Sequence, residues 1–128
     1  MKKNVLVIDD EQDVHVLIEN LLDQKKYNVI TAIDGLEGFQ TAYTMTPDLI
    51  ILDVQMPKLD GFEVYKKLLE DHQTSNIPVI MLTGIADKRG IHFDNEDMKQ
   101  YFTKEPAAYI EKPFEPKKFV DLVDSILN

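Results

Sequence analysis

Short apolar runs alternate along the chain with stretches of helical period. The runs at residues 4–8 and 49–52 are apolar almost throughout, which is typical of strands buried on both faces of a sheet. Three further runs, at residues 28–32, 77–82 and 107–110, are short and predominantly apolar. We therefore expect five strands.

Four stretches outside these runs repeat apolar residues every three or four positions, which indicates helices with one buried face. The first helix carries its apolar residues at Val14, Leu17, Ile18, Leu21 and Leu22. The others begin at Gly35, behind Asp60, and at Glu115 followed by Pro116. Asp60 also forms a capping-box pattern with Glu63, three residues on.

The stretch from Gly84 to Pro106 is the least regular part of the chain. Asp94 can begin a helix that runs through Met98 to Phe102, but its apolar stripe is thin. The pattern therefore supports only a short helix in this stretch.

The alternation of strands and helices predicts an α/β fold with a parallel sheet, helices on both faces and right-handed crossovers. A length of 128 residues corresponds to one domain, so we expect a single domain over residues 1–128. In such sheets the functional site lies beyond the carboxyl ends of the strands. Candidate chemistry is therefore expected at that edge.

Composition excludes several classes of protein. The chain has no cysteine, which excludes disulfide scaffolds, thiolate nucleophiles and Cys-ligated metal centres. Its apolar runs are too short to cross a membrane or to form a signal-peptide core, so we expect a cytoplasmic protein. A count of 14 basic against 23 acidic residues gives a net charge of −9, which argues against direct binding of nucleic acid.

Polar residues follow the predicted carboxyl ends of four strands: Asp9 and Asp10, Asp53, Thr83, and Lys112. An acidic pair after a strand often does no more than begin a helix, and that alternative stays open for Asp9 and Asp10. Neighbouring carboxylates repel each other, by roughly 4 kcal/mol for two unit charges about 4 Å apart near a protein surface. A hard cation relieves this repulsion, and Mg²⁺ prefers oxygen ligands.

These residue types suit phosphoryl transfer. A carboxylate beside bound Mg²⁺ and a lysine can attack a phosphoryl group and form an acyl phosphate. Lys112 and the metal would offset the charge on the phosphoryl oxygens, and Thr83 can donate a hydrogen bond to one of them.

Five motifs in order along the chain resemble the receiver domain of two-component response regulators, and the resemblance covers nearly the whole chain. The motifs are Val5 to Glu11, Pro47 to Pro57, Asp60-Gly61, Val79 to Thr83, and Tyr109 to Phe114. The family fold is a doubly wound, flavodoxin-like sheet of five parallel strands in the order 2-1-3-4-5, with helices on both faces. The resemblance implies the same fold here.

The resemblance also implies a role for each strand-end residue. Asp53 is expected to be the phosphoacceptor, which takes its phosphoryl group from a sensor histidine kinase or a phosphotransfer protein. Thr83 and Lys112 are expected to bind the phosphoryl oxygens. Asp10 and Asp53 are expected to ligate Mg²⁺ directly, with Asp9 acting through a water molecule.

Further expectations follow from the same resemblance. Gln55 would bind Mg²⁺ through its backbone carbonyl, and the Lys112–Pro113 peptide bond would be cis. Tyr109 matches the aromatic switch position, whose ring moves inward as Thr83 moves toward the phosphoryl group.

The resemblance thus implies a phosphorylation-dependent signalling switch whose conformational change alters the binding of an effector protein of unknown identity. Its only expected chemistry is its own phosphorylation and autodephosphorylation, so we do not expect an enzyme. The chain ends at Asn128, just after the last predicted helix, so no output domain is expected within it. A stand-alone regulator and an excised domain both fit.

The sequence departs from the family pattern before the last strand. Thr83 and Lys112 are 29 positions apart, several more than is usual, and the extra length lies between Gly84 and Pro106. Many family members dimerise or dock partners through this region. Phosphorylation-dependent homodimerisation therefore stays an open expectation.

Two rival functions remain. A magnesium-dependent aspartate-nucleophile phosphatase would share the nucleophile, the metal and the sheet, but such enzymes carry an acid two residues past the nucleophile, where this chain has Gln55. A degenerate receiver acting as a scaffold is disfavoured by the intact set of strand-end residues.

The remaining conspicuous residues suggest no chemistry. The three histidines, His15, His72 and His92, are expected on the surface. Gly61 is expected to shape the loop that follows the site.

Overall fold

The computed structural model describes residues 2–56, 59–84 and 104–128. The helix expected from Asp94 to Phe102 lies outside these residues, as does His92. The described elements are β1 (Lys3–Ile8), α1 (Gln12–Leu21), β2 (Tyr27–Ala32), α2 (Gly35–Met45), β3 (Leu49–Asp53), α3 (Gly61–Glu70), β4 (Val79–Gly84), β5 (Ala108–Lys112) and α5 (Pro116–Leu127). No helix in these ranges is long and apolar enough to cross a membrane.

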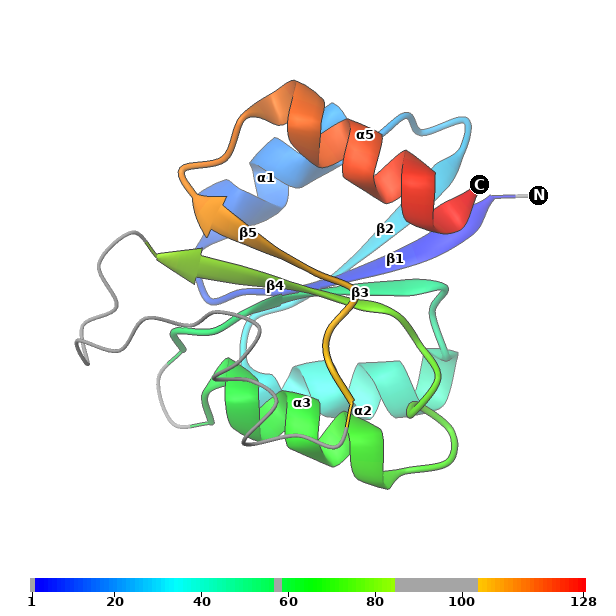
Figure 1. The fold of residues 1–128 in the computed structure, drawn as a ribbon, viewed down its shortest axis with the longest axis vertical. Helices are drawn as coiled ribbons and strands as arrows, with labels where there is room; N and C mark the ends of the chain where they lie inside the picture. Colours follow the sequence, from blue (N-terminus) through cyan, green and yellow to red (C-terminus); the bar gives the residue numbers. More distant parts are fainter. Residues whose placement is uncertain (1, 57–58, 85–103) are drawn as a thin grey trace.

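The strands form one parallel sheet in the order β2-β1-β3-β4-β5, which confirms the order that the family resemblance implied (Figure 1). In the register of this sheet, Asp53 at the end of β3 pairs with Leu82 of β4. Lys112 at the end of β5 pairs with Gly84 at the end of β4. The carboxyl ends of the strands therefore meet at one edge.

Helices cover both faces of the sheet, with α1 and α5 on one side and α2 and α3 on the other (Figure 1). Alternate strand residues enter the two cores, as β1 illustrates. Its Leu6 and Ile8 belong to the core under α2 and α3, and its Val5 and Val7 belong to the core under α1 and α5. All four side chains are fully buried, which explains the continuous apolar run.

The observed bounds of β4 and β5 differ from the predicted ones. β4 begins at Val79 rather than Ile77, because Pro78 has no N–H to donate to the sheet. The carbonyl of Pro78 still accepts a hydrogen bond from the backbone N–H of Ile50 at 3.0 Å. Both strands also extend further at their carboxyl ends, so Thr83 and Lys112 belong to the strands instead of following them.

The buried face of α1 is rotated from the predicted one. Val14 and Ile18 are buried as expected, but Leu17 is 41% exposed and His15 only 1% exposed. The prediction that His15 lies on the surface was therefore wrong, whereas His72 is exposed as predicted. Burial of His15 is tolerated because its side chain bonds to a backbone carbonyl, as described below.

Side-chain caps begin two of the helices. The carboxylate of Asp34 accepts a hydrogen bond from the backbone N–H of Glu37 at 2.8 Å, at the start of α2. Asp60 accepts one from the backbone N–H of Glu63 at 3.0 Å, at the start of α3. The cap predicted at Asp60 is thus confirmed, and it fixes the helix that follows the site.

A polar cluster links β2 to α5 at the opposite edge of the sheet. The Tyr27 hydroxyl donates a hydrogen bond to Asp124, and Asn128 Nδ2 donates one to Tyr27 Oη at 3.3 Å. Burial and the neighbouring Asp124 raise the pKa of Tyr27, so its hydroxyl keeps its proton. Tyr27 itself is buried.

Replacing Tyr27 with phenylalanine is expected to lower the free energy of unfolding by about 1 kcal/mol, because the change removes these hydrogen bonds and keeps the ring. Urea unfolding followed by circular dichroism measures the change. The exposed Tyr43 provides the matched control, since Tyr43→Phe should leave the free energy of unfolding unchanged. Equal effects of the two substitutions would show that the cluster adds no stability.

Candidate functional site

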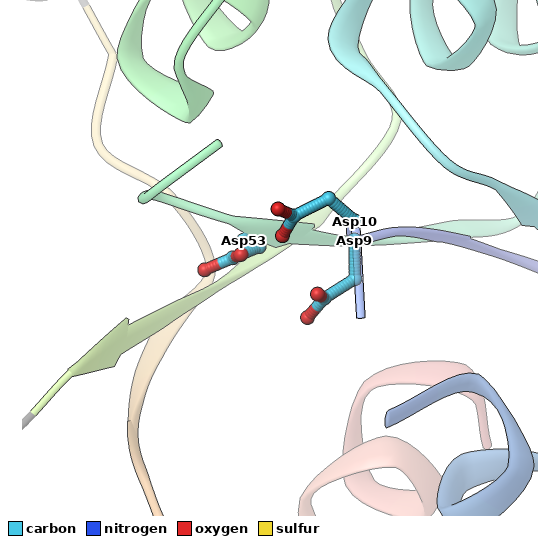
Figure 2. A group of neighbouring side chains, drawn as sticks. All are labelled: Asp9, Asp10 and Asp53. Atoms are coloured by element: carbon cyan, nitrogen blue, oxygen red, sulfur yellow. The ribbon is translucent and has the colours of Figure 1, made fainter. Parts of the chain in front are cut away.

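Three carboxyl groups lie together at the carboxyl edge of the sheet. Asp9 and Asp10 follow β1, and Asp53 ends β3 beside them (Figure 2). One carboxylate oxygen from each residue lies within 4.8 Å of the others. Asp9 and Asp53 are 0% and 3% exposed, whereas Asp10 is exposed. Solvent therefore reaches the cluster on the side of Asp10.

Lys112 of β5 supplies the positive charge next to this cluster. Its Nζ donates a hydrogen bond to Asp9 Oδ2 at 2.9 Å and lies 3.5 Å from Asp53 Oδ1 and 3.9 Å from Glu11 Oε1. Burial alone would lower the pKa of Lys112, but the surrounding carboxylates outweigh it and raise that pKa above its usual value. The amine therefore keeps its charge.

The pKa of Asp53 is raised from 3.8 to about 7, first by burial and then by the charge of Asp9. Lys112 and the backbone N–H of Gln55, which donates to Asp53 Oδ1 at 3.2 Å, oppose this effect only in part. One lysine thus does not neutralise three carboxyl groups. Without a further cation, Asp53 is protonated part of the time near pH 7.

The cluster fits a hard divalent cation. It offers oxygen ligands alone, two of them from buried residues, and its exposed side leaves room for metal-bound water. Mg²⁺ binds through one or two carboxylates and keeps several waters, which matches this arrangement. A bound cation would also favour the ionised form of Asp53.

Thr83 lies next to this cluster in β4. It follows Leu82, which pairs with Asp53 across the sheet. Its hydroxyl donates a hydrogen bond to the backbone carbonyl of Ile110 at 3.5 Å, a long contact. Such a contact restrains the hydroxyl weakly.

The remaining predicted residues lie around the same edge. Gln55 is half-buried two residues past Asp53. Tyr109 is half-buried in β5, where it pairs with Met81 and packs against the core under α2 and α3. The Lys112–Pro113 peptide bond is cis, as the family resemblance implied.

Gly61 has a closer relation to the site than the predicted loop role suggested. Its backbone N–H donates a hydrogen bond to the carbonyl of Val54 at 2.9 Å, which brings the start of α3 against the end of β3. A Cβ atom at Gly61 would lie 2.3 Å from the backbone oxygen of Asp53. Only glycine allows this approach, and the sequence signals a turn but not the contact.

His15 also belongs to the site, and the sequence prediction missed it. Its Nε2 lies 2.6 Å from the backbone oxygen of Asp9. The histidine directly follows Val14, a predicted buried position, and lies outside the five family motifs, so the sequence pattern contains no signal for this contact.

Comparisons with known proteins agree with this geometry. The family model described as "Response regulator receiver domain" matches residues 5–124. PhoP, the alkaline phosphatase synthesis transcriptional regulatory protein of Bacillus subtilis (strain 168), is 40% identical over 130 residues, which cover 100% of this chain and 50% of PhoP. The polar-differentiation response regulator DivK of Brucella anthropi is 34% identical over 128 residues, which cover 100% of this chain and 98% of DivK.

A solved structure gives the same result for the fold. The crystal structure of chemotaxis protein CheY4 from Vibrio cholerae matches with a TM-score of 0.82 and 27% identity, over 99% of this chain and 100% of that chain. This chain spans about half the length of several curated relatives, PhoP among them, and nearly the whole of DivK.

Proposed function

Because the chain belongs to the response regulator receiver domains, we propose that it is a phosphorylation-dependent signalling switch with Asp53 as its phosphoacceptor. The observation that carries the proposal is the position of the Asp53 carboxyl group. It is buried, belongs to a cluster of three carboxyl groups, and lies 3.5 Å from Lys112 Nζ.

In the proposed reaction, an oxygen of Asp53 attacks the phosphorus atom of a phosphohistidine on a sensor kinase or phosphotransfer protein. An O–P bond forms, the donor's P–N bond breaks, and the bonding electrons return to the donor histidine. Asp53 must be ionised to attack, so the proton that it holds in the metal-free site leaves to solvent first, and a bound cation would favour this ionised form. Mg²⁺, when bound, supplies positive charge that offsets the charge of the phosphoryl oxygens.

We propose the remaining site roles from the family resemblance and these contacts. Asp10 and Asp53 ligate the metal directly, Asp9 acts through water, and Gln55 contributes its backbone carbonyl. Lys112 is already bonded to Asp9 and can bind a phosphoryl oxygen from the same position.

The switch is proposed to connect Thr83 with Tyr109. The weak bond between the Thr83 hydroxyl and the Ile110 carbonyl breaks when the hydroxyl turns to a phosphoryl oxygen. Tyr109 precedes Ile110 in β5 and would move inward with this change, which alters the surface presented to an effector protein.

Incubation with Mg²⁺ and acetyl phosphate, followed by intact-mass analysis, tests the phosphoacceptor role. The wild-type protein should gain one phosphoryl group, and Asp53→Asn should gain none. The exposed Asp121 of α5 provides the control, since Asp121→Asn should be labelled like the wild type. A wild-type protein without added mass, or full labelling of Asp53→Asn, would overturn the proposal.

Incubation with an external phosphomonoester separates the switch from a phosphatase. A phosphatase would hydrolyse the phosphomonoester over many turnovers, whereas a receiver would take up a single phosphoryl group from a suitable donor. Gln55 stands where such phosphatases carry their acid, which favours the receiver. We propose that self-phosphorylation and autodephosphorylation are its only catalysed reactions.

Partners and location follow from this role. We propose a sensor histidine kinase or a phosphotransfer protein as the donor and the cytoplasm as the location, with no direct contact to nucleic acid or membrane through residues 1–128. Phosphorylation-dependent homodimerisation is part of the same proposal.

A further inference from the structure

His15 occupies the first turn of α1 and reaches back toward the end of β1. Its side chain is 1% exposed, and its Nε2 lies 2.6 Å from the backbone oxygen of Asp9. A carbonyl oxygen can only accept a hydrogen bond, so Nε2 carries the proton and donates it. This orientation of the His15 side chain is typical of residues in helices, whose side chains point toward the helix N-terminus.

This bond acts on the peptide unit that joins Asp9 to Asp10. The other polar groups of Asp9 are held elsewhere: its N–H bonds to the carbonyl of Ala32 at 3.1 Å, its Oδ1 accepts from the N–H of Glu11 at 2.9 Å, and its Oδ2 accepts from Lys112 Nζ at 2.9 Å. Of these four bonds, only the one from His15 is made to the Asp9 carbonyl. This bond therefore fixes the plane of the Asp9–Asp10 peptide, and that plane sets the direction in which the Asp10 side chain points.

Packing alone does not favour a histidine at this position. Its second nitrogen, Nδ1, is buried and has no hydrogen-bond partner among the residues that the structure describes. Burial of such an atom costs free energy. An apolar side chain would avoid that cost and would extend the buried stripe formed by Val14 and Ile18. The hydrogen bond from His15 to the Asp9 carbonyl offsets the cost of burying Nδ1.

We propose that His15 is a positioning residue for the cation site: its Nε2–H bond holds the Asp9–Asp10 peptide in the orientation that lets both carboxylates serve Mg²⁺. The proposal rests on the proposed function, because the cation is the one that phosphoryl transfer to Asp53 requires. It assigns no contact between His15 and the metal. Partners that orient the ligands of a metal commonly change its affinity by about 10–100-fold when removed.

Two substitutions of similar length separate the bond from the packing. His15→Met fills the space without a donor, and His15→Gln keeps an amide N–H near the position of Nε2. Mg²⁺ affinity is measured for each by NMR titration of the intact chain without any phosphodonor. We expect an affinity about 3–10-fold weaker for His15→Met, since the lost bond is to the backbone and not to a ligating carboxylate. His15→Gln should restore most of the affinity.

The phosphorylation rate at different Mg²⁺ concentrations provides a second measurement. For His15→Met, the Mg²⁺ concentration for half-maximal rate should rise by the same factor, while the rate at saturating Mg²⁺ changes little. Ile18→Val, a buried change one turn along α1, provides the control for loss of packing and should leave the Mg²⁺ affinity unchanged.

The outcomes separate this proposal from the phosphoacceptor role. Wild-type affinity in His15→Met, equal losses in the Met and Gln variants, or a Met variant that does not fold would each overturn the positioning role. Phosphorylation of the wild type would still support the switch in all three cases. Conversely, a wild type that binds Mg²⁺ but takes up no phosphoryl group overturns the switch, and the titration still tests His15.

Discussion

Replacing Gly61 with alanine is expected to lower the free energy of unfolding by about 3 kcal/mol and to slow phosphorylation of Asp53 at least about tenfold. A Cβ atom there would lie 2.3 Å from the backbone oxygen of Asp53 and 2.7 Å from the Cα of Val54. Both neighbours are backbone atoms, so no side chain can rotate away. Either α3 or the end of β3 must move, and a movement of β3 displaces Asp53, the proposed phosphoacceptor.

Asp60→Ala is the matched control for this change. It removes the cap at the start of the same helix, a bond of 3.0 Å to the Glu63 N–H, without adding an atom near Asp53. It should cost about 1 kcal/mol and leave phosphorylation at the wild-type rate. Chemical unfolding and the acetyl phosphate assay measure both effects. If Gly61→Ala behaves like Asp60→Ala in both measurements, the close approach has no functional importance.

Asp53→Asn should stabilise the protein in the absence of metal, by about 2 kcal/mol above pH 7. The folded protein raises the pKa of Asp53 to about 7 from 3.8, which means that the buried pocket favours the neutral carboxyl group. Each pKa unit corresponds to about 1.4 kcal/mol, and local rearrangement around an ionised Asp53 recovers part of the total. Asparagine is neutral at every pH and avoids this cost.

The sign of the pH dependence follows from the same shift. Below about pH 4, Asp53 is protonated in both the folded and the unfolded chain. The wild type and Asp53→Asn should therefore be equally stable there, apart from other effects of the amide. Between about pH 4 and 7, Asp53 keeps its proton in the folded chain and loses it in the unfolded chain. The wild type therefore loses stability relative to Asp53→Asn as the pH rises through this range, and the difference is constant above it.

Urea unfolding in EDTA at several pH values between 4 and 8 measures this difference. Asp121→Asn removes one charge at an exposed position of α5, away from this cluster, and provides the control for the change in net charge. Parallel pH profiles for the wild type and Asp53→Asn would contradict a raised pKa at Asp53.

Much of the fold follows from the sequence because its strands are buried on both faces. The run at residues 4–8 predicted β1 to within one residue, since every side chain from Val5 to Ile8 enters a core. The strand ends were harder to predict. Thr83 and Lys112 are polar and therefore interrupt the apolar pattern, although their backbones still pair in the sheet.

The site was predictable where it depends on strand ends and not where it depends on tertiary contact. Parallel strands bring their carboxyl ends together, so Asp9, Asp53 and Lys112 meet although they are far apart in sequence. The rotation of α1 that buries His15 depends on how the helix packs. A histidine beside an apolar stripe gives the same pattern whether it faces in or out.

The contact between Lys112 and Asp9 spans 103 positions of the chain. All three carboxylates of the cluster are synthesised well before the lysine that accompanies them. A nascent chain that has not yet placed β5 beside β4 therefore carries the acidic cluster without its counter-charge. The proposed phosphoryl transfer to Asp53 would therefore require the completed sheet, in which Lys112 lies beside Asp9 and Asp53.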